Sequence, residues 1–459
     1  MRKTQTDMQK NEIITLEITG MTNEGCGIGR AGGMVVFVPL SAVGDSLRVR
    51  IVKVNKSHCY GKIEEILTPS PDRIDVDCLV FGKCGGCDFR HISYEAELRA
   101  KDGFIRDAFT RIGGLEPEFL PIIGNCNIDS YRNKTQYPVR KNEQGETVCG
   151  FFAERSHRVI CCEQCRLEQD IFSDVRCAAL DLAHELKVSP YNEAEHSGVL
   201  RSICIRRGHH SGEIGVTLVV RRAVPQLKAL AAALSQKFSE IKSIVANVNK
   251  AETNVIYGDE ERLLFGAPVI YDRMCGKRFA VSSRSFYQVN TPMAEILYQK
   301  AAELAQPDGK TVIDLYCGAG TIGLTMADRA KSVIGVEIVE SAVENARENA
   351  RLNGADNVRF FCGDAGEITH KLAAEGIKAD VVIVDPARKG CDEETIGNIV
   401  KFSPERIVMV SCNAVTAARD CRALTERGYE LRTVQGVDLF SRTRHVECVV
   451  LMSKTQDKS

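Results

Sequence analysis

One cysteine and one glutamate near the end of the chain have side chains that could act together on a substrate. Cys412 stands between Ser411 and Asn413 directly after an apolar run, and Glu447 closes an Arg-His-Val-Glu run before the last apolar stretch. A thiolate is a strong nucleophile, and a carboxylate beside it can remove a proton. The pair therefore predicts covalent catalysis with a general base. The competing interpretation of Cys412 is a small buried apolar side chain, because free cysteine is among the most buried residue types.

The chain after Thr291 alternates strands and helices in a pattern that would bring these two residues together. We expect strands at residues 311–315, 332–337, 358–362, 381–384 and 407–411. Helices between them indicate a parallel sheet with right-handed crossovers. The runs 431–437 and 446–452 have only a loop between them, so they should pair antiparallel at the sheet edge. Glu447 would then begin a strand at the edge where Cys412 follows one.

A glycine-rich loop after the first of these strands predicts a nucleotide-cofactor site. Gly318, Gly320 and Gly323 have the spacing of a dinucleotide fingerprint, which permits a tight turn and close backbone approach. A nicotinamide or flavin oxidoreductase is therefore a competing class. S-adenosylmethionine is favoured by three acids at strand ends, Asp314, Glu337 and Asp364. The first would repel a pyrophosphate but pair with an ammonium group, while the others could accept hydrogen bonds from ribose hydroxyls and an adenine amino group.

A uracil base is the substrate on which a thiol and a carboxylate have distinct uses. C5 of uracil is a poor nucleophile until another group adds to C6, and a thiolate can make that addition. Cys412 would attack C6, the C5 enolate would take the methyl group, and Glu447 would remove the C5 proton so that elimination releases the cysteine. The residues therefore predict methylation at C5.

Five motifs resemble the RNA uracil-5-methyltransferase family: Phe286-Tyr-Gln-Val-Asn290, Asp314 to Gly323, Asp385-Pro-Ala-Arg388, Ser411-Cys412-Asn413 and His445-Val-Glu447. The resemblance implies that Cys412 is the nucleophile and Glu447 the base. It also implies cofactor contacts from Gln288, Tyr316, Glu337, Asp364 and Asp385, to which we add Thr321. The chain departs from the family pattern at Ala387 and Ala414, where proline is usual, and looser loops are expected there.

Nineteen cysteines in a chain without a secretory signal favour metal ligands over disulfides. Two groups have ligand-like spacing, namely Cys78, Cys84 and Cys87, and then Cys161, Cys162 and Cys165. Spacing alone leaves a zinc site and an iron–sulfur cluster equally open. The resemblance implies a 4Fe-4S cluster held by Cys78, Cys84, Cys87 and Cys165, as in the branch of the family that methylates 23S ribosomal RNA.

Three domains are expected from the change of pattern along the chain. Residues 1–70 alternate apolar and polar positions between glycine-rich turns, which is typical of a small antiparallel barrel, with 20–33 as a flexible hairpin. The resemblance implies that this barrel is a TRAM domain, an RNA-binding fold of the oligonucleotide-binding type. Residues 71–285 should form a mixed α+β central domain with the cluster, and residues 286–459 a Rossmann-like α/β methyltransferase domain.

RNA binding has to come from local features, because the formal net charge is only −1. Two basic clusters of the central domain could face RNA: Arg132, Lys134, Arg140 and Lys141, and then Arg201, Arg206, Arg207, His209, His210, Arg221 and Arg222. The absence of a long apolar run predicts no membrane span. We expect a cytoplasmic monomer, and the resemblance implies that its substrate is 23S ribosomal RNA. The T-loop uridine of transfer RNA is the alternative substrate, and a non-catalytic RNA-binding module with a metal staple is the remaining competing class.

Overall fold

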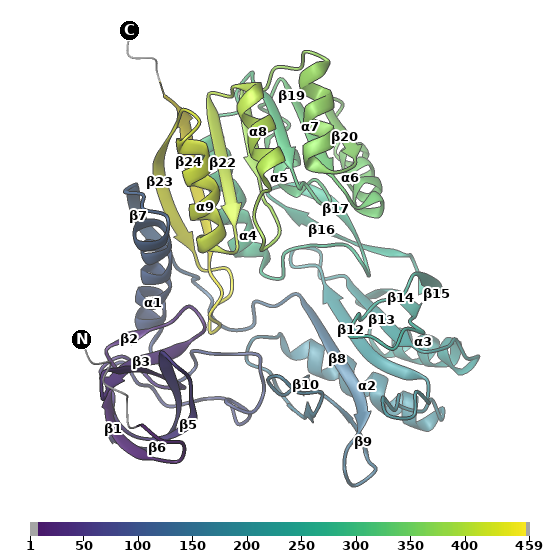
Figure 1. Cartoon of the computed structure of the whole chain (residues 1–459). Helices are drawn as coiled ribbons and strands as arrows, with labels where there is room; N and C mark the ends of the chain where they lie inside the picture. The colour runs from purple at the N-terminus through teal and green to yellow at the C-terminus, as the bar shows by residue number, and fades with distance from the viewer. Residues whose placement is uncertain (1–7, 456–459) are drawn as a thin grey trace.

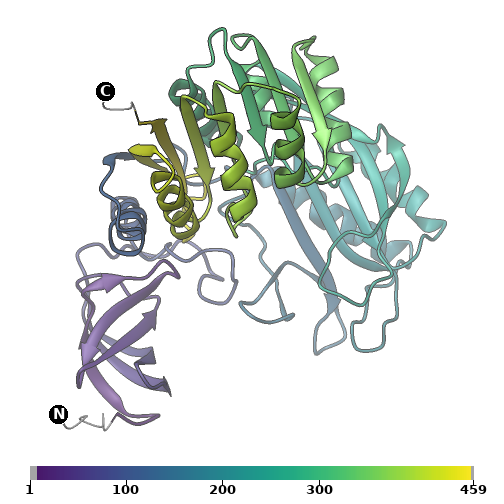
Figure 2. The same cartoon turned by 45° about the horizontal axis from the view of Figure 1, so that its top comes forward.

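The computed structural model describes residues 8–455 of the chain and contains three regions (Figure 1). They are an N-terminal barrel, a central region, and a C-terminal region built on a large sheet. In both views the barrel lies on one side of the molecule and the central sheet on the other, and the C-terminal region adjoins both (Figure 2). Within residues 8–455, no helix combines the length and the apolar composition that crossing a membrane requires.

The N-terminal barrel is a six-stranded sheet with the order β1-β5-β6-β4-β3-β2. Its strands are β1 (Ile13–Glu17), β2 (Gly20–Met21), β3 (Cys26–Ala31), β4 (Met34–Pro39), β5 (Ser46–Val54) and β6 (His58–Thr68). Alternate apolar side chains fill its interior, as period-two patterning requires. β4 and β6 pair in parallel, so the sheet is not wholly antiparallel.

The expected hairpin over residues 20–33 is present, because β2 pairs antiparallel with β3. A Cβ atom on Gly27 would lie 2.0 Å from the Ser41 hydroxyl oxygen, and one on Gly29 would lie 2.6 Å from the Glu17 carbonyl oxygen. The glycines are therefore sites of close packing between neighbouring chain segments, a meaning that glycine in a strand often has.

The central region is a six-stranded sheet with the order β15-β14-β13-β12-β8-β9. Its strands are β8 (Lys134–Lys141), β9 (Thr147–Cys149), β12 (Leu200–Arg207), β13 (Ile214–Val220), β14 (Ile241–Val248) and β15 (Glu260–Gly266). Helices α2 (Asp170–Glu185) and α3 (Gln226–Lys237) pack on one face. Two hairpins complete the region: β10 (Phe151–Phe152) with β11 (Val159–Ile160), and β16 (Val269–Met274) with β17 (Lys277–Ser282).

The C-terminal region contains an eight-stranded sheet with the order β20-β19-β18-β21-β22-β24-β23-β7. Its last seven strands in the sequence are β18 (Thr311–Leu315), β19 (Ser332–Glu337), β20 (Val358–Cys362), β21 (Val381–Val384), β22 (Arg406–Ser411), β23 (Tyr429–Val437) and β24 (Glu447–Lys454). The first five are parallel, and β24 runs antiparallel to β22 and β23, so the predicted pattern is confirmed.

Helices cover both faces of this sheet. One apolar core contains α4 (Thr291–Ala305), α5 (Thr321–Met326) and α6 (Glu340–Leu352). The other contains α7 (Ala365–Ala374), α8 (Glu393–Phe402) and α9 (Ala414–Thr425). Branched apolar side chains from both faces of β18, β21 and β22 are fully buried, which explains why these strands are almost continuously hydrophobic.

The eighth strand, β7 (Glu118–Ile123), comes from a part of the sequence expected in the central domain. It pairs in parallel with β23, and the Gln435 side-chain amide donates a 2.8 Å hydrogen bond to the Pro121 carbonyl. Proline cannot donate to a strand neighbour, so an edge position suits it. The preceding helix α1 (Tyr94–Asp107) continues into a π-helical turn, η1 (Ala108–Ile112).

Candidate active site

The carboxyl ends of the parallel strands of the large sheet point toward the central region (Figure 1). Open parallel sheets bind ligands at this edge, because loops from neighbouring strands meet there. The loops after β18, β21 and β22 and the start of β24 meet there, and they carry the motifs singled out in the sequence.

Cys412 and Glu447 lie opposite each other at this edge. Ser411 pairs with Cys448 in the antiparallel ladder of β22 and β24, so the next residue pair outward is Cys412 with Glu447. Burial, followed by the nearby Glu447 carboxyl, raises the pKa of the Cys412 thiol. Burial, followed by Asp385, raises the pKa of Glu447 to about 8. The two groups therefore share one weakly solvated environment, in which the Glu447 carboxyl opposes ionisation of the Cys412 thiol.

Arg388 supplies the positive charge of this environment. It lowers the pKa of both Cys412 and Glu447, against the effect of burial. Its Nη2 lies 3.2 Å from Nδ1 of His445, whose pKa is lowered to about 4, mainly by burial and then by Arg388. His445 is thus neutral at pH 7. The Arg388 carbonyl accepts a 3.0 Å hydrogen bond from the side-chain amide of Asn413, which connects the loop after β21 to the loop that carries Cys412.

The two alanines at positions where proline is usual lie in ordered turns. The Ala387 carbonyl accepts a 2.8 Å hydrogen bond from the Gly390 amide. Ala414 is the first residue of α9, and the Asn413 side chain caps this helix by accepting from the Val415 amide at 3.2 Å. Backbone and capping hydrogen bonds therefore hold both segments without proline.

The glycine-rich loop between β18 and α5 is held by two carboxylates. The Gly318 amide donates to Glu337 Oε2 at 3.1 Å, and the Gly323 amide donates to Asp314 Oδ2 at 2.9 Å. Gly320 has φ 78°, and a Cβ atom there would lie 2.7 Å from the Phe360 ring. Asp314 is fully buried beneath the loop and holds it through Oδ2, while its Oδ1 is buried without a partner within residues 8–455. The expected contact with an ammonium group stays a prediction.

Glu337 and Asp364 lie at neighbouring strand ends with part of their acceptor capacity free. Glu337 Oε1 accepts from the Val339 amide at 2.9 Å, and Asp364 caps α7 by accepting from the Gly366 amide at 2.8 Å. Ile338, directly after Glu337, exposes 63% of its surface, and Val339 exposes 50%. This exposed apolar surface beside a carboxylate was not singled out in the sequence, where Glu337-Ile-Val resembles the end of an ordinary strand.

Tyr298 on α4 was also missed, although it lies among the predicted residues. Its hydroxyl is 3.4 Å from the Thr321 hydroxyl, and its pKa is raised by burial and then by Asp385, with Gln288 and Glu447 also in its surroundings. In the sequence, Tyr298 has the spacing of a core residue of an amphipathic helix, and no further signal separates it from one.

Tyr316 lies at the start of the glycine-rich loop in a left-handed conformation with φ 62°. Its hydroxyl donates a 3.5 Å hydrogen bond to Thr395 of α8, and burial raises the pKa of its phenol. The side chain therefore lies along the side of the loop that faces α8, whereas Thr321 and Gln288 are grouped around Tyr298.

The cysteines of the central region gather in a second place. Burial raises the pKa of Cys87 to about 11, and Cys84 and Cys78 raise it further. Cys87 likewise contributes to the raised pKa of Cys165. Cys162 is buried in the same neighbourhood, close enough to Cys78 and Cys84 for them to raise its pKa. Among residues 8–455, no three side chains of the His, Cys, Asp and Glu types are grouped as ligands of a single metal ion.

The segment of residues 78–89, which carries Cys78, Cys84 and Cys87 and is called the cysteine segment, contacts the loop that leads to Glu447. The Asp88 and Phe89 amides donate to the Arg442 carbonyl at 2.9 and 3.1 Å, and Asp88 Oδ2 accepts from the Arg444 amide at 2.9 Å. Lys101 of α1 bonds Asp438 at 2.6 Å at the other end of the same loop, and both side chains are fully buried. Segments distant in the sequence therefore fix the approach to β24.

Two protein-family models and several known proteins match most of the chain. The model of the family described as tRNA (Uracil-5-)-methyltransferase matches residues 93–455, and the TRAM domain model matches residues 8–63. An uncharacterised RNA methyltransferase of Halalkalibacterium halodurans is 42% identical over 98% of this chain and 99% of its own length. One of Bacillus cereus is 41% identical over 98% of each chain.

A solved structure is similar over nearly the whole molecule. The Pyrococcus abyssi tRNA (uracil-54, C5)-methyltransferase in complex with S-adenosyl-L-homocysteine has a TM-score of 0.78 and 27% identity, over 96% of this chain and 100% of the other. These matches favour the S-adenosylmethionine interpretation of the glycine-rich loop over the dinucleotide one. The chain belongs to the tRNA (uracil-5-)-methyltransferase family of S-adenosylmethionine-dependent RNA methyltransferases, and its N-terminal barrel is a TRAM domain.

Proposed function

We propose that this chain methylates C5 of a uridine in 23S ribosomal RNA, with Cys412 as nucleophile and Glu447 as base. The observation that carries the proposal is the antiparallel register that sets Cys412 opposite Glu447. The presence of a cysteine group together with the TRAM barrel supports a ribosomal substrate through the resemblance to that branch. Transfer RNA is the second candidate, because the similar archaeal enzyme acts on uracil 54 of transfer RNA.

The first step of the reaction is addition of the Cys412 sulfur to C6 of the uracil. Arg388 favours the thiolate, since its charge lowers the pKa of the cysteine. The new C6–S bond moves the electrons of the C5–C6 double bond into an enolate, which makes C5 nucleophilic. Within structured RNA the target base must leave its stack before Cys412 can reach C6.

The second half of the reaction removes one proton and frees the cysteine. S-adenosylmethionine supplies the electrophilic methyl group that C5 takes. Glu447, as a carboxylate, then accepts the C5 proton, and the C6–S bond breaks as the C5–C6 double bond forms again. With a pKa near 8, the Glu447 carboxylate is a stronger base than an ordinary carboxylate, and the fraction of Glu447 in this form increases as the pH rises toward 8.

The cofactor would lie between the glycine-rich loop and the ends of β19 and β20. Glu337 and Asp364 have free acceptor capacity for ribose hydroxyls and an adenine amino group. The exposed side chain of Ile338 offers apolar surface for a ring. Burial raises the pKa of Asp385 to about 7, and a cationic ligand beside this carboxyl would favour its charged form. Gln288, Tyr316 and Thr321 complete the proposed contact set.

The cysteine group would hold a 4Fe-4S cluster through Cys78, Cys84, Cys87 and Cys165. Cys84 and Cys78 raise the pKa of Cys87, and Cys87 raises that of Cys165, so each of these thiols has another nearby, although no three are grouped as metal ligands within residues 8–455. Metal binding would favour their thiolate forms. A bound cluster would order the segment that contacts the loop before Glu447. We propose that this segment belongs to a central domain of residues 71–285, between a barrel of residues 1–70 and a catalytic domain of residues 286–459.

Mapping 5-methyluridine in cellular RNA, with and without the gene, tests the substrate. Loss of 5-methyluridine from 23S ribosomal RNA alone is the expected result. Loss from the transfer RNA T-loop alone would replace the ribosomal assignment with the second candidate. Restoration by the wild-type gene, compared with the Cys412→Ala gene, controls for indirect effects.

A further inference from the structure

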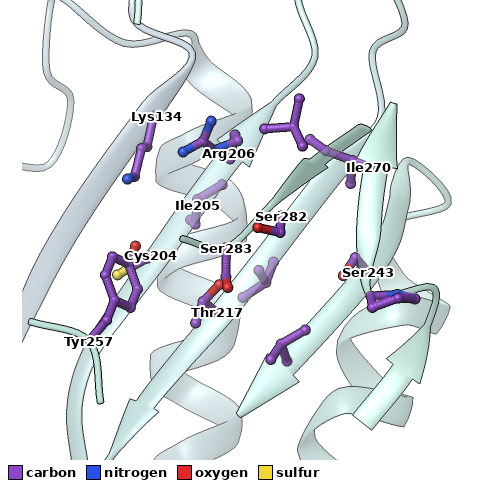
Figure 3. A pocket seen from close by; sticks show the side chains of 15 residues that line it. Lys134, Cys204, Ile205, Arg206, Thr217, Ser243, Tyr257, Ile270, Ser282 and Ser283 are labelled. Carbon is purple, nitrogen blue, oxygen red and sulfur yellow. The ribbon is translucent and has the colours of Figure 1, made fainter. Parts of the chain in front are cut away.

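A small cavity in the central region is lined by two cationic side chains, and neither has an anionic partner among residues 8–455 (Figure 3). It lies between the central sheet and the β16–β17 hairpin, and Lys134 and Arg206 stand at one end of it. Both belong to the basic clusters seen in the sequence, and neither takes part in the proposed chemistry. The proposed reaction therefore does not explain why these two cations are buried together.

Arg206 exposes only 7% of its surface, yet its guanidinium has unused hydrogen-bonding capacity. Nη2 donates a 2.7 Å hydrogen bond to the Ser285 carbonyl, but Nε and Nη1 are buried and have no partner in the described part of the chain. Burial lowers its pKa to about 10. An unpaired buried charge is costly, and such a site is normally completed by a hydrogen-bonding partner of opposite charge.

Lys134 adds a second positive charge to the same end of the cavity. Its pKa is lowered to about 8, by burial first and then by Arg206. The Lys134 Nζ atom lies 5.4 Å from the centre of the Tyr257 ring. No carboxylate is among the groups that shift the pKa of either cation. The two side chains could therefore bind an anion that no residue within 8–455 supplies.

The size of the cavity restricts that anion. Its volume is about 20 Å³, which is room for roughly one or two water-sized groups. A nucleobase is too large for this space, whereas the non-bridging oxygens of a phosphate group are each the size of a water molecule and opposite in sign of charge to the two cations. Lysine as a point charge and arginine as a planar donor both bind phosphate.

We propose that this cavity binds a phosphodiester group of the RNA substrate, a role that rests on the proposed function. Its location supports an RNA ligand. Phe286, in the loop that Arg206 contacts through Ser285, exposes 70% of its surface. Asn133, next to Lys134, donates to the Gln288 carbonyl and to the Thr291 hydroxyl, each at 2.9 Å. Anion binding would therefore fix the loop that carries Gln288. Because Gln288 is a proposed cofactor contact, RNA binding would be linked to the cofactor site.

The test compares Lys134→Gln with Lys228→Gln in the full-length chain. Side chains alternate between the faces of the central sheet, and Lys228 lies exposed on α3, on the face opposite the cavity. Affinity for a fluorescent fragment of uridine-containing 23S ribosomal RNA is measured over a salt series. Lys134→Gln should weaken binding about tenfold and reduce the salt slope by about 1, as loss of one phosphate contact does. Lys228→Gln should change neither value, and Lys134→Arg should restore binding.

Equal affinities and salt slopes for the Lys134→Gln and Lys228→Gln proteins would overturn the proposal. Replacing single RNA linkages with uncharged methylphosphonates identifies the ligand. Replacement at one linkage should weaken RNA binding by the wild type and leave RNA binding by Lys134→Gln unchanged. If inorganic phosphate instead raises the Tm of the wild type but not of Lys134→Gln, while RNA binding is equal in both, the cavity binds a free anion and the RNA assignment is wrong. Binding is measured without methyl transfer, so failure of the proposed function would be seen separately.

Discussion

The edge of the large sheet and the cysteine segment of the central region hold their sulfur atoms in different ways. Cys412 follows β22, and the ladder with β24 sets its position opposite Glu447. Cys84 lies in turns, with only isolated bridges to Phe81 and Ala153. Regular strand pairing fixes the position of a side chain without any ligand, whereas the conformation of an irregular segment depends on the ligand that it binds. Substitutions at the sheet edge should therefore change chemistry, and those in the cysteine segment should change stability.

The largest effect should come from Cys412→Ala. Without the thiol no addition to C6 is possible, so methyl transfer should fall by at least about 10⁴-fold. The half-buried thiol lies outside the strand ladder, so the Tm should stay within about 2 °C of the wild type. Methyl incorporation and calorimetry check both values. Cys177→Ala, at an exposed position of α2, is the control and should remain active. A fully active Cys412→Ala protein would refute the nucleophile assignment.

Glu447→Gln should slow turnover by about 10²–10⁴-fold, the range for loss of a general base. Because addition and methylation precede proton removal, the methylated RNA should stay attached to Cys412. A band of protein crosslinked to RNA on a denaturing gel would show this adduct. The band should be absent for the double variant Cys412→Ala, Glu447→Gln, and that result would identify Cys412 as the residue to which the RNA is attached. Normal product release by Glu447→Gln would exclude Glu447 as the base.

Cys87→Ser and Cys162→Ser separate a metal ligand from a neighbouring buried thiol. After anaerobic purification, the wild type should be brown and contain about four iron atoms per chain. Cys87→Ser should lose iron and lower the Tm by about 5 °C or more, whereas Cys162→Ser should keep its iron. Iron analysis and calorimetry measure both. A colourless zinc protein, or equal iron loss in the two variants, would refute the proposed ligand set.

The smallest effect concerns pH. The raised pKa of Glu447 means that the carboxyl is protonated below about 8, and a protonated carboxyl cannot accept the C5 proton. Single-turnover rates should therefore rise with pH and be about tenfold lower at pH 7 than on the plateau. Arg388→Gln removes the charge that lowers the pKa of both Cys412 and Glu447, so the midpoint should move to higher pH. Arg388→Lys should largely restore it. Identical profiles for all three proteins would contradict this electrostatic role.

The sequence was sufficient to predict the parts of the site that depend on regular strands. Alternation of strands and helices predicts which edge carries Cys412, and the loop-linked final strands predict the approach of Glu447. It was not sufficient for contacts made across long separations. Pairing of β7 with β23 depends on edges far apart in the chain, and Tyr298 has the spacing of a core residue. Gly27 and Gly29 have the composition of a loop, and only packing against Ser41 and Glu17 shows why a strand needs them.

Release of tritium from RNA labelled at C5 of uridine tests the central claim most directly. The wild-type protein is incubated with S-adenosylmethionine and a labelled fragment of 23S ribosomal RNA, and methyl transfer and tritium release are counted together. Attack by Cys412 at C6, followed by loss of the C5 proton to Glu447, predicts one tritium released for each methyl group transferred. Methyl transfer with the tritium retained would contradict the account, because the methyl group would then lie on another atom.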